Sequence, residues 1–205
     1  MNILIVAATN DEISPLKGIN SVNHDLDFLL TGAGMVATAY ELTKKLSTKN
    51  YDLAINCGIA GSFERSFKIG EVVSVADDIF SELGAEDGNE FLSLFKIGID
   101  GKDSFQNTFS LKPFSMNELK EVRSITVNTV HGNESSIQSI IKRCQPQIES
   151  MEGAAFFFVC EKENLPSLQL RSISNYIESR NKNNWNIPLA LENLKVTLQK
   201  LISTL

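Results

Sequence analysis

The segment QIESMEGAAFFFVC, residues 147–160, is the stretch around which the rest of the chain is organised. From Gly153 onward it is apolar on every side, so it predicts a helix that is buried rather than amphipathic. Glu152 stands at the entrance of that helix, near the positive end of the helix dipole. A carboxylate beside a buried segment must be paired, hydrogen-bonded to a ligand or neutral. By position alone, Glu152 is more simply explained as a cap of its own first turn.

The length and composition fit a single domain, residues 1–205. The formal net charge is −6, and acidic and basic residues are interleaved. Because nucleic-acid binding normally shows as a basic patch, we expect no nucleic-acid partner. We expect no membrane partner either, since no run has the length of a transmembrane helix and the N-terminus lacks the basic flank of a signal peptide.

The cysteines and histidines predict neither disulfides nor a metal centre. The three cysteines form no CxxC pair and stand mostly in apolar surroundings, which is typical of core thiols in a reducing, cytoplasmic environment. His24 and His131 are the only histidines, so we expect no histidine-based metal site and no cofactor. We interpret His131 as a turn residue.

Apolar runs alternate with helical patterns along the chain, which predicts an α/β fold with a largely parallel or mixed sheet. Strands are predicted at residues 2–8, 26–30, 52–56, 71–76, 122–130 and 168–173. Helices are predicted from residue 35 to 46, over 134–143, and from Ile187 to the C-terminus with Pro188 in the first turn. Residues 77–117 predict strand pieces and loops, and one interpretation of them is a flap over a site.

Polar or glycine-rich segments follow several of these strands at their carboxyl ends, the edge where ligands bind in open α/β sheets. They are Glu12, Gly32-Ala33-Gly34, Gly58-Ile59-Ala60-Gly61 and Asn175. Tight turns explain the glycine segments, a solvated loop position explains Glu12, and a turn explains Asn175. Functionally, Glu12 could be a general base, and the Asn175 amide could present an acceptor and two donors to a planar heterocycle.

Two segments resemble the nucleoside phosphorylase/nucleosidase superfamily: Ser150-Met151-Glu152-Gly153-Ala154-Ala155 and Arg171-Ser172-Ile173-Ser174-Asn175. The glycine segments fall where that superfamily has its glycine turns, so the resemblance covers essentially the whole chain. Residues 83–88, 127–130, 174–181 and 185–188 are most similar to the futalosine hydrolase family within it. The resemblance implies a three-layer phosphorylase/hydrolase-like fold with a central mixed sheet flanked by helices.

The resemblance also implies roles for individual residues. Glu152 would accept hydrogen bonds from the ribose 2′- and 3′-hydroxyls, Met151 would pack under the sugar, and Glu12 would position the attacking water. The further substrate-binding positions that it implies are Gly34, Ile59 and Asn128. Family members commonly assemble, so a homodimer or higher homo-oligomer is expected.

Asn175 occupies the position where relatives that act on adenine nucleosides have Asp. Its amide nitrogen can donate to a 6-oxo oxygen while its carbonyl accepts from a protonated N7, which favours hypoxanthine or guanine over adenine. An amide is not a useful acid, so the proton that reaches N7 must come from elsewhere.

Phosphorylases of the superfamily surround phosphate with arginines, one of them where this chain has Asn56. The arginines here lie outside the glycine segments, and the Glu12 carboxylate would repel phosphate but assist a water. The resemblance therefore implies hydrolysis of the N-ribosidic bond of futalosine in menaquinone biosynthesis, releasing hypoxanthine and dehypoxanthinylfutalosine. The alternatives are a methylthioadenosine/S-adenosylhomocysteine nucleosidase or other purine nucleosidase, a phosphorylase, and a non-catalytic nucleoside-binding protein on the same scaffold.

Futalosine carries a carboxyphenyl ketone, and an apolar pocket for it could come from Phe105, Phe109 and Phe114. Ordinary core packing explains these three phenylalanines equally well.

Overall fold

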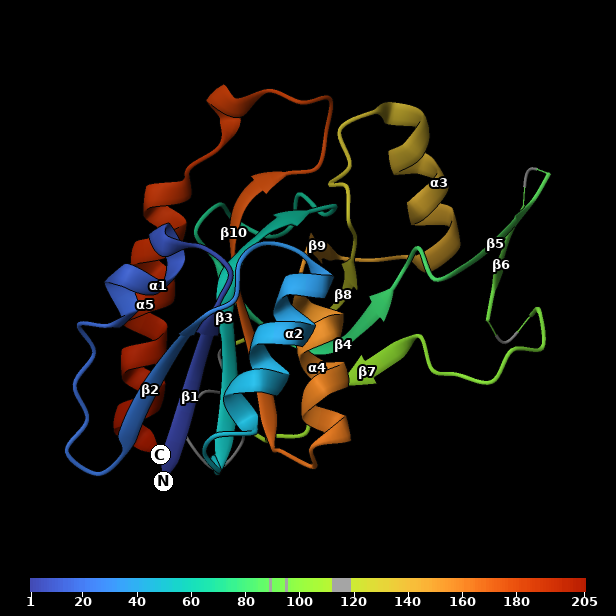
Figure 1. The fold of residues 1–205 in the computed structure, drawn as a ribbon. Helices are drawn as coiled ribbons and strands as arrows, with labels where there is room; N and C mark the ends of the chain where they lie inside the picture. Colours follow the sequence, from blue (N-terminus) through green and yellow to red (C-terminus); the bar gives the residue numbers. More distant parts are fainter. Residues whose placement is uncertain (89, 95, 112–118) are drawn as a thin grey trace.

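A computed structural model of the chain describes residues 1–88, 90–94, 96–111 and 119–205. These residues form an eight-stranded mixed sheet with helices on both faces (Figure 1). The strands of the sheet are β1 (Asn2–Ala7), β2 (Asp25–Leu30), β3 (Leu53–Ser62), β4 (Val72–Phe80), β7 (Ser104–Gln106), β8 (Glu121–Thr126), β9 (Ile148–Ser150) and β10 (Ser167–Tyr176). A separate hairpin of β5 (Gly84–Asp87) and β6 (Glu90–Ser93) projects to one side.

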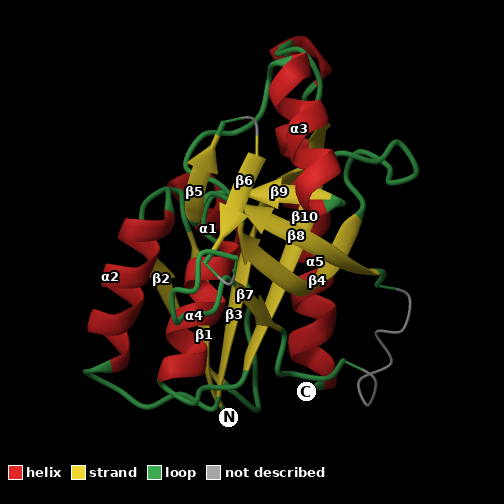
Figure 2. Ribbon diagram, turned by 90° about the vertical axis from the view of Figure 1, so that its right-hand side faces the viewer, coloured by secondary structure: helices red, strands yellow, loops and turns green. Residues whose placement is uncertain are grey.

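The helices are α1 (Asn10–Leu16), α2 (Met35–Leu46), α3 (Glu134–Cys144), α4 (Gly153–Lys162) and α5 (Ile187–Thr204), and a 3₁₀ turn, η2, spans Lys182–Asn184. Figures 1 and 2 show α1 and α5 on one face of the sheet and α2 and α4 on the other. Helix α3 lies apart from both pairs, near the hairpin.

The strands run in the order β10-β4-β8-β9-β3-β1-β2, and β10 pairs with β3 as well as with β4. This second pairing closes β10, β4, β8, β9 and β3 into a ring. Strand β1 is parallel to β2 and β3, and β10 is parallel to β3. The carboxyl ends of these four strands therefore meet at one edge, which is where ligands bind in α/β sheets.

The apolar run of β1 is buried on both faces because its side chains alternate between two cores. Ile3 and Ile5 belong to the core that includes Leu194 and Leu198 of α5. Leu4 and Val6 belong to the opposite core, which includes Phe156, Phe157 and other residues of α4. Helix α4 is buried over most of its surface, as its uniformly apolar sequence predicts.

The predicted α/β class and central mixed sheet are confirmed, but several local predictions are wrong. Residues 58–61 are not a turn; they lie inside β3, where Gly58 and Gly61 have no side chains and let neighbouring groups approach the strand. Glu12 is not in a loop, because α1 begins at Asn10 and places Glu12 in its first turn. Asn175 lies within β10 rather than beyond its end. The predicted strand over 122–130 ends at Thr126.

The aromatic residues of the irregular stretch are not all available to a ligand. Phe105 is 2% exposed and packs edge-on against Phe80 and Phe158, with ring centroids 5.6 and 5.5 Å away. Phe109 packs against the core on the α5 side, and Phe114 lies outside the described residues. Phe105 is thus a core residue. Within the described ranges, no helix is long and apolar enough to cross a bilayer.

Candidate active site

Glu152 is the N-cap residue of α4, yet its carboxylate does not cap that helix. Oε1 instead accepts a hydrogen bond from the main-chain nitrogen of Gly34 at 3.0 Å, and Oε2 accepts from the main-chain nitrogen of Met151 at 3.3 Å. The capping interpretation is therefore wrong. Burial raises the pKa of the Glu152 carboxyl, and the Arg171 charge and the Gly34 amide act in the opposite direction.

Glu12 is 6% exposed and is held from two elements, so it is not the solvated loop residue that its position suggests. In a capping box with Thr9, its Oε2 accepts from the main-chain nitrogen and the hydroxyl of Thr9 at 3.0 and 2.8 Å. Its Oε1 accepts from the main-chain nitrogen of Ile59 in β3 at 3.0 Å. The helix start and the strand together fix the direction of the carboxylate.

Arg171 reaches the same place from β10, which the sequence does not indicate. It is 1% exposed, its Nε donates to Oε1 of Gln169 at 2.9 Å, and its Nη2 donates to Oδ1 of Asn56. Arg171 is the register partner of Gly58, and a Cβ at Gly58 would collide with both Nη1 of Arg171 and Oε1 of Glu12. Arg171 lies outside the glycine segments in the sequence, but strand pairing places it beside Gly58.

A buried polar chain connects this arginine to the start of α4. The fully buried Asp78 accepts from Thr126 Oγ1 at 2.8 Å and from Gln169 Nε2 at 3.2 Å. Thr126 Oγ1 in turn accepts from the main-chain nitrogen of Ala154 at 2.7 Å. Burial raises the pKa of Asp78 to about 6, although Thr126 and the Arg171 charge act to lower it. No sequence pattern marks Asp78, because a single polar residue in a strand does not reveal its partners.

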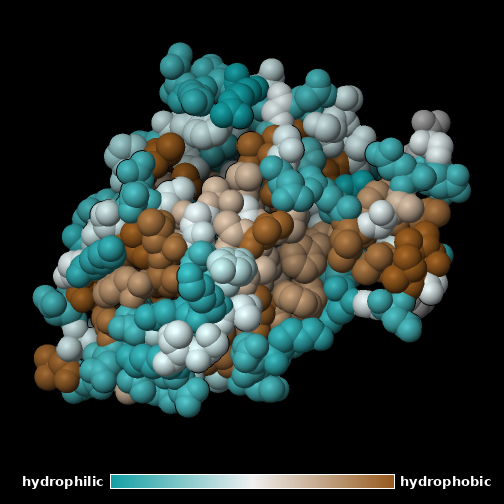
Figure 3. All heavy atoms as spheres, in the orientation of Figure 1, coloured by the Kyte–Doolittle hydropathy of each residue, from teal (hydrophilic) through white to brown (hydrophobic). Residues whose placement is uncertain are grey.

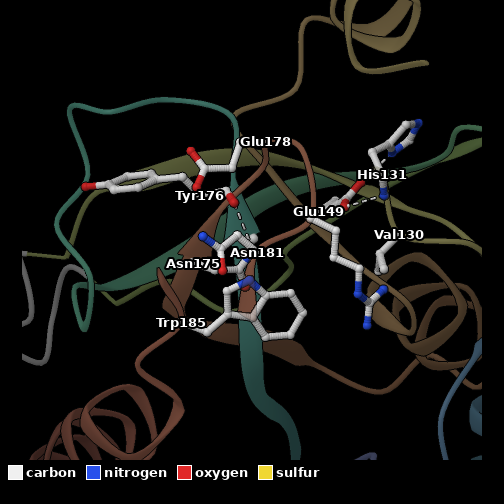
Figure 4. Close-up of a pocket in the computed structure, with 10 residues that line it drawn as sticks. Val130, His131, Glu149, Asn175, Tyr176, Glu178, Asn181 and Trp185 are labelled. Carbon is white, nitrogen blue, oxygen red and sulfur yellow. Dashed lines mark hydrogen bonds and ion pairs between the residues drawn. The ribbon is translucent and has the colours of Figure 1, made fainter. Parts of the chain in front are cut away.

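Asn175 lies at a neighbouring cavity, shown in Figure 4. Its Nδ2 donates to the carbonyl of Tyr176 at 3.1 Å and its Oδ1 accepts from the hydroxyl of Ser174 at 2.7 Å. Since the Tyr176 carbonyl can only accept, this contact fixes which way the amide is turned. The cavity is lined by Gly61, Val130, His131, Glu149, Asn175, Tyr176, Glu178, Arg180, Asn181 and Trp185.

Asn128 lies at a second, mostly apolar cavity of about 240 Å³ together with Met35, Phe80, Glu82 and Leu83. Its main-chain nitrogen and Nδ2 both donate to Oε2 of Glu82, at 3.0 and 3.1 Å. Met35 directly follows Gly34, the residue that donates to Glu152. A residue that lines this cavity is thus the chain neighbour of one that bonds to Glu152.

The site thus combines two buried carboxylates with a buried guanidinium. The charge of Glu12 is among the causes that raise the pKa of Glu152, and the charge of Arg171 lowers it, so the three groups lie within electrostatic range of one another. Such a site can orient a water and favour a developing positive charge on a substrate. Within the described part of the chain, no group of three or more His, Cys, Asp or Glu side chains is arranged to hold a metal ion.

The mixed sheet with helices on both faces agrees with the family comparison. The family model of the phosphorylase superfamily matches residues 28–204, and the chain belongs to that superfamily. Futalosine hydrolase of Thermus thermophilus is 27% identical over 92% of this chain and 84% of its own length. Futalosine hydrolase of Streptomyces coelicolor is 31% identical over 87% of this chain and 79% of its own length.

Solved structures share the fold over the full chain. Futalosine hydrolase of Helicobacter pylori superposes with a TM-score of 0.86 at 18% identity, covering 100% of this chain and 98% of that one. The 5′-methylthioadenosine/S-adenosylhomocysteine nucleosidase of the same organism superposes with a TM-score of 0.88 at 17% identity, covering 100% and 99%.

Proposed function

We propose that this protein hydrolyses the N-ribosidic bond of futalosine, releasing hypoxanthine and dehypoxanthinylfutalosine for menaquinone biosynthesis. The observation that carries this proposal is the convergence of Glu12 and Glu152, two buried carboxylates held by main-chain amides at one sheet edge. The curated futalosine hydrolases that match most of the chain support the choice of substrate.

Glu152 would hold the ribose. The amides of Gly34 and Met151 occupy one lone pair on each carboxylate oxygen, so the remaining lone pairs can accept from the 2′- and 3′-hydroxyls. The Met151 side chain would pack under the sugar. As the glycosidic bond breaks, positive charge develops on the ribose, and the ionised Glu152 would stabilise it at short range.

Glu12 would act on the water. Its Oε1 is anchored by Ile59, and its second oxygen is anchored by Thr9, so the carboxylate cannot turn away from the site. A base held in this way can orient a water and accept its proton, which is worth roughly 10²–10⁴ in rate. Asn175 would donate to the 6-oxo oxygen of the departing base.

Hydrolysis is favoured over phosphorolysis because Arg171, the buried arginine at this edge, already donates to other protein groups. Two of the nitrogens of Arg171 donate to Gln169 and Asn56. The adjacent carboxylates of Glu12 and Glu152 would repel a phosphate dianion, whereas a neutral water can approach them.

A methylthioadenosine/S-adenosylhomocysteine nucleosidase is the second candidate, since structures of such enzymes share this fold. Asn175 opposes it. Adenine offers a 6-amino donor, which would face the Nδ2 donor whose orientation the Tyr176 carbonyl fixes.

A homodimer or higher homo-oligomer is part of the proposal. Side chains of α2, α4 and the loop before β5 leave apolar surface exposed: Val36 at 82%, Tyr40 at 63%, Leu83 at 40% and Phe158 at 37%. Figure 3 shows tan and brown apolar surface across this face. The unpaired cysteines, with Cys57 and Cys160 buried, suit a reducing cytoplasm.

The test is to incubate the purified protein with futalosine, methylthioadenosine and inosine, each with and without phosphate, and to measure free base. We expect hypoxanthine from futalosine at a rate independent of phosphate. A protein that leaves futalosine intact, or that requires phosphate, contradicts the proposal. Release of adenine from methylthioadenosine as the fastest reaction would favour the second candidate.

A further inference from the structure

Three residues form a row across three neighbouring strands at the cavity in Figure 4. Gly61 of β3 is the register partner of Asn175 in β10 on one side and of Glu149 in β9 on the other. Paired residues direct their side chains to the same face of a sheet. Because adjacent strands lie about 4.8 Å apart, the main chains of Asn175 and Glu149 lie roughly 10 Å apart, on either side of Gly61.

Gly61 lets the side chains of Asn175 and Ile177 lie close to β3. A Cβ at Gly61 would lie 3.3 Å from Nδ2 of Asn175 and 2.9 Å from Cγ1 of Ile177. A side chain at position 61 would therefore press on Ile177 and on the Asn175 amide. Both of these residues, together with Gly61, line the same cavity.

Glu149 is a buried carboxylate for which the proposed reaction has no use so far. It is 3% exposed, and both its oxygens are contacted by His131: Oε1 accepts from the main-chain nitrogen at 2.9 Å and Oε2 lies 2.6 Å from Nδ1. Since an ionised carboxylate only accepts, Nδ1 of His131 carries the hydrogen. A carboxylate has about four lone-pair sites, so acceptor capacity remains on Glu149 after these two bonds.

Asn175 and Glu149 match the polar groups on the two sides of C6 in a 6-oxopurine. Hypoxanthine presents a protonated N7 and the O6 acceptor to one side and the N1–H donor to the other, whereas N1 of adenine is an acceptor. A carboxylate can satisfy N1–H but opposes the lone pair of an adenine N1. Burying such a mismatch leaves polar groups unpaired and discriminates strongly.

We propose that Glu149 is a specificity-determining residue that accepts the N1–H of hypoxanthine, opposite Asn175 at O6 and N7. His131 is the positioning residue that holds the Glu149 carboxylate. This inference rests on the proposed function, because it assigns the base that the same site releases. It makes the choice of a 6-oxo base a property of two residues on different strands rather than of Asn175 alone.

The test compares Glu149→Gln with the wild type, with Glu192→Gln on the exposed side of α5 as the matched control. Affinities for free hypoxanthine and free adenine are measured by titration calorimetry, and folding is checked by thermal unfolding. We expect Glu149→Gln to lose roughly 10- to 100-fold in hypoxanthine affinity while adenine affinity stays equal or rises, since the glutamine NH₂ can donate to N1 of adenine. Glu192→Gln should leave both affinities unchanged.

An unchanged hypoxanthine affinity, or an equal loss for both bases, overturns the inference. If Glu149→Gln does not fold, the wild type decides the matter with 1-methylhypoxanthine, which lacks the N1–H and should bind roughly 10- to 100-fold more weakly than hypoxanthine. Equal binding of the two overturns the inference. Base titrations do not depend on turnover, so a protein that binds hypoxanthine with this preference but leaves futalosine intact would contradict the proposed function alone.

Discussion

The main-chain nitrogen of Gly34 donates to Oε1 of Glu152 at 3.0 Å, although 118 residues separate them in the chain. Gly34 precedes α2 and Glu152 precedes α4, so this bond joins the starts of the two helices that cover one face of the sheet. It turns a carboxylate that could have capped its own helix toward the ligand edge. The geometry of the site depends on this contact.

Glu152→Gln should lower kcat/KM for futalosine by at least roughly 100-fold, because a neutral amide cannot stabilise positive charge on the ribose. Burial raises the pKa of the Glu152 carboxyl, so the ionised form that the reaction needs is lost on acidification at a pH above the ordinary value of 4.5. The wild-type pH profile of kcat/KM should show this acidic limb. Glu163→Gln, at the exposed far end of α4, is the control and should retain full activity.

Glu12→Gln should lower kcat by roughly 10²–10⁴ because the general base is lost. Thr9→Ala is the matched variant, since it removes the hydroxyl from the capping box but leaves both Glu12 oxygens bonded, to the main-chain nitrogens of residue 9 and Ile59. It should cost about 1 kcal/mol of stability with little change in kcat. Steady-state kinetics and thermal unfolding measure both effects. A Glu12→Gln protein with wild-type kcat would remove the base from this mechanism.

Gly34→Ala tests the bond to Glu152 through the backbone. Gly34 has φ +95° and Gly32 has φ +86°, so an alanine is strained at either position and should cost about 1–3 kcal/mol of stability. Of these two glycines, Gly34 is the one that donates to Glu152, so Gly34→Ala should also raise KM for futalosine, whereas Gly32→Ala should change stability alone. An equal rise in KM for both variants would show that backbone strain, and not the bond to Glu152, changes KM.

Asp78→Asn should change the pH dependence of stability. The folded-state pKa of Asp78 is raised from 3.8 to about 6, so the folded protein holds this proton more tightly than the unfolded chain. The resulting stabilisation is fully present below pH 3.8 and is lost as the pH rises through about 6, a change of ~3 kcal/mol. Denaturant unfolding of both proteins between pH 4 and 7 measures it. A slope over this range that matches in the variant and the wild type would contradict the assignment.

Asn175→Asp should shift the preference of the enzyme toward 6-amino substrates, because a protonated aspartate can donate to N7 and accept from the amino group. The measurement is the ratio of kcat/KM values for futalosine and methylthioadenosine. Asn181→Asp, also at the rim of the cavity, is the comparison variant and should alter this ratio far less. An unchanged ratio in Asn175→Asp would refute the donor–acceptor assignment.

The sequence by itself determined the layers of this protein. The unbroken apolar run of β1 predicts a strand covered on both faces, and the uniformly apolar segment after Gly153 predicts the buried helix α4. It also predicted that Glu12, the glycine segments and Asn175 gather at one edge, because alternating strands and helices favour parallel strands whose carboxyl ends share an edge. These features depend on local periodicity, which a sequence displays directly.

Only the tertiary structure decided what each polar group contacts. Arg171 meets Gly58, and Glu149 faces Asn175 across Gly61, through strand registers between segments far apart in the chain. Glu12 bonds to Ile59 47 residues away, and Asp78 lies beneath α4 through Thr126. Hydrogen-bond partners are set by three-dimensional neighbours, and no spacing in the sequence encodes them. The layers therefore follow from periodicity, whereas the site follows from register.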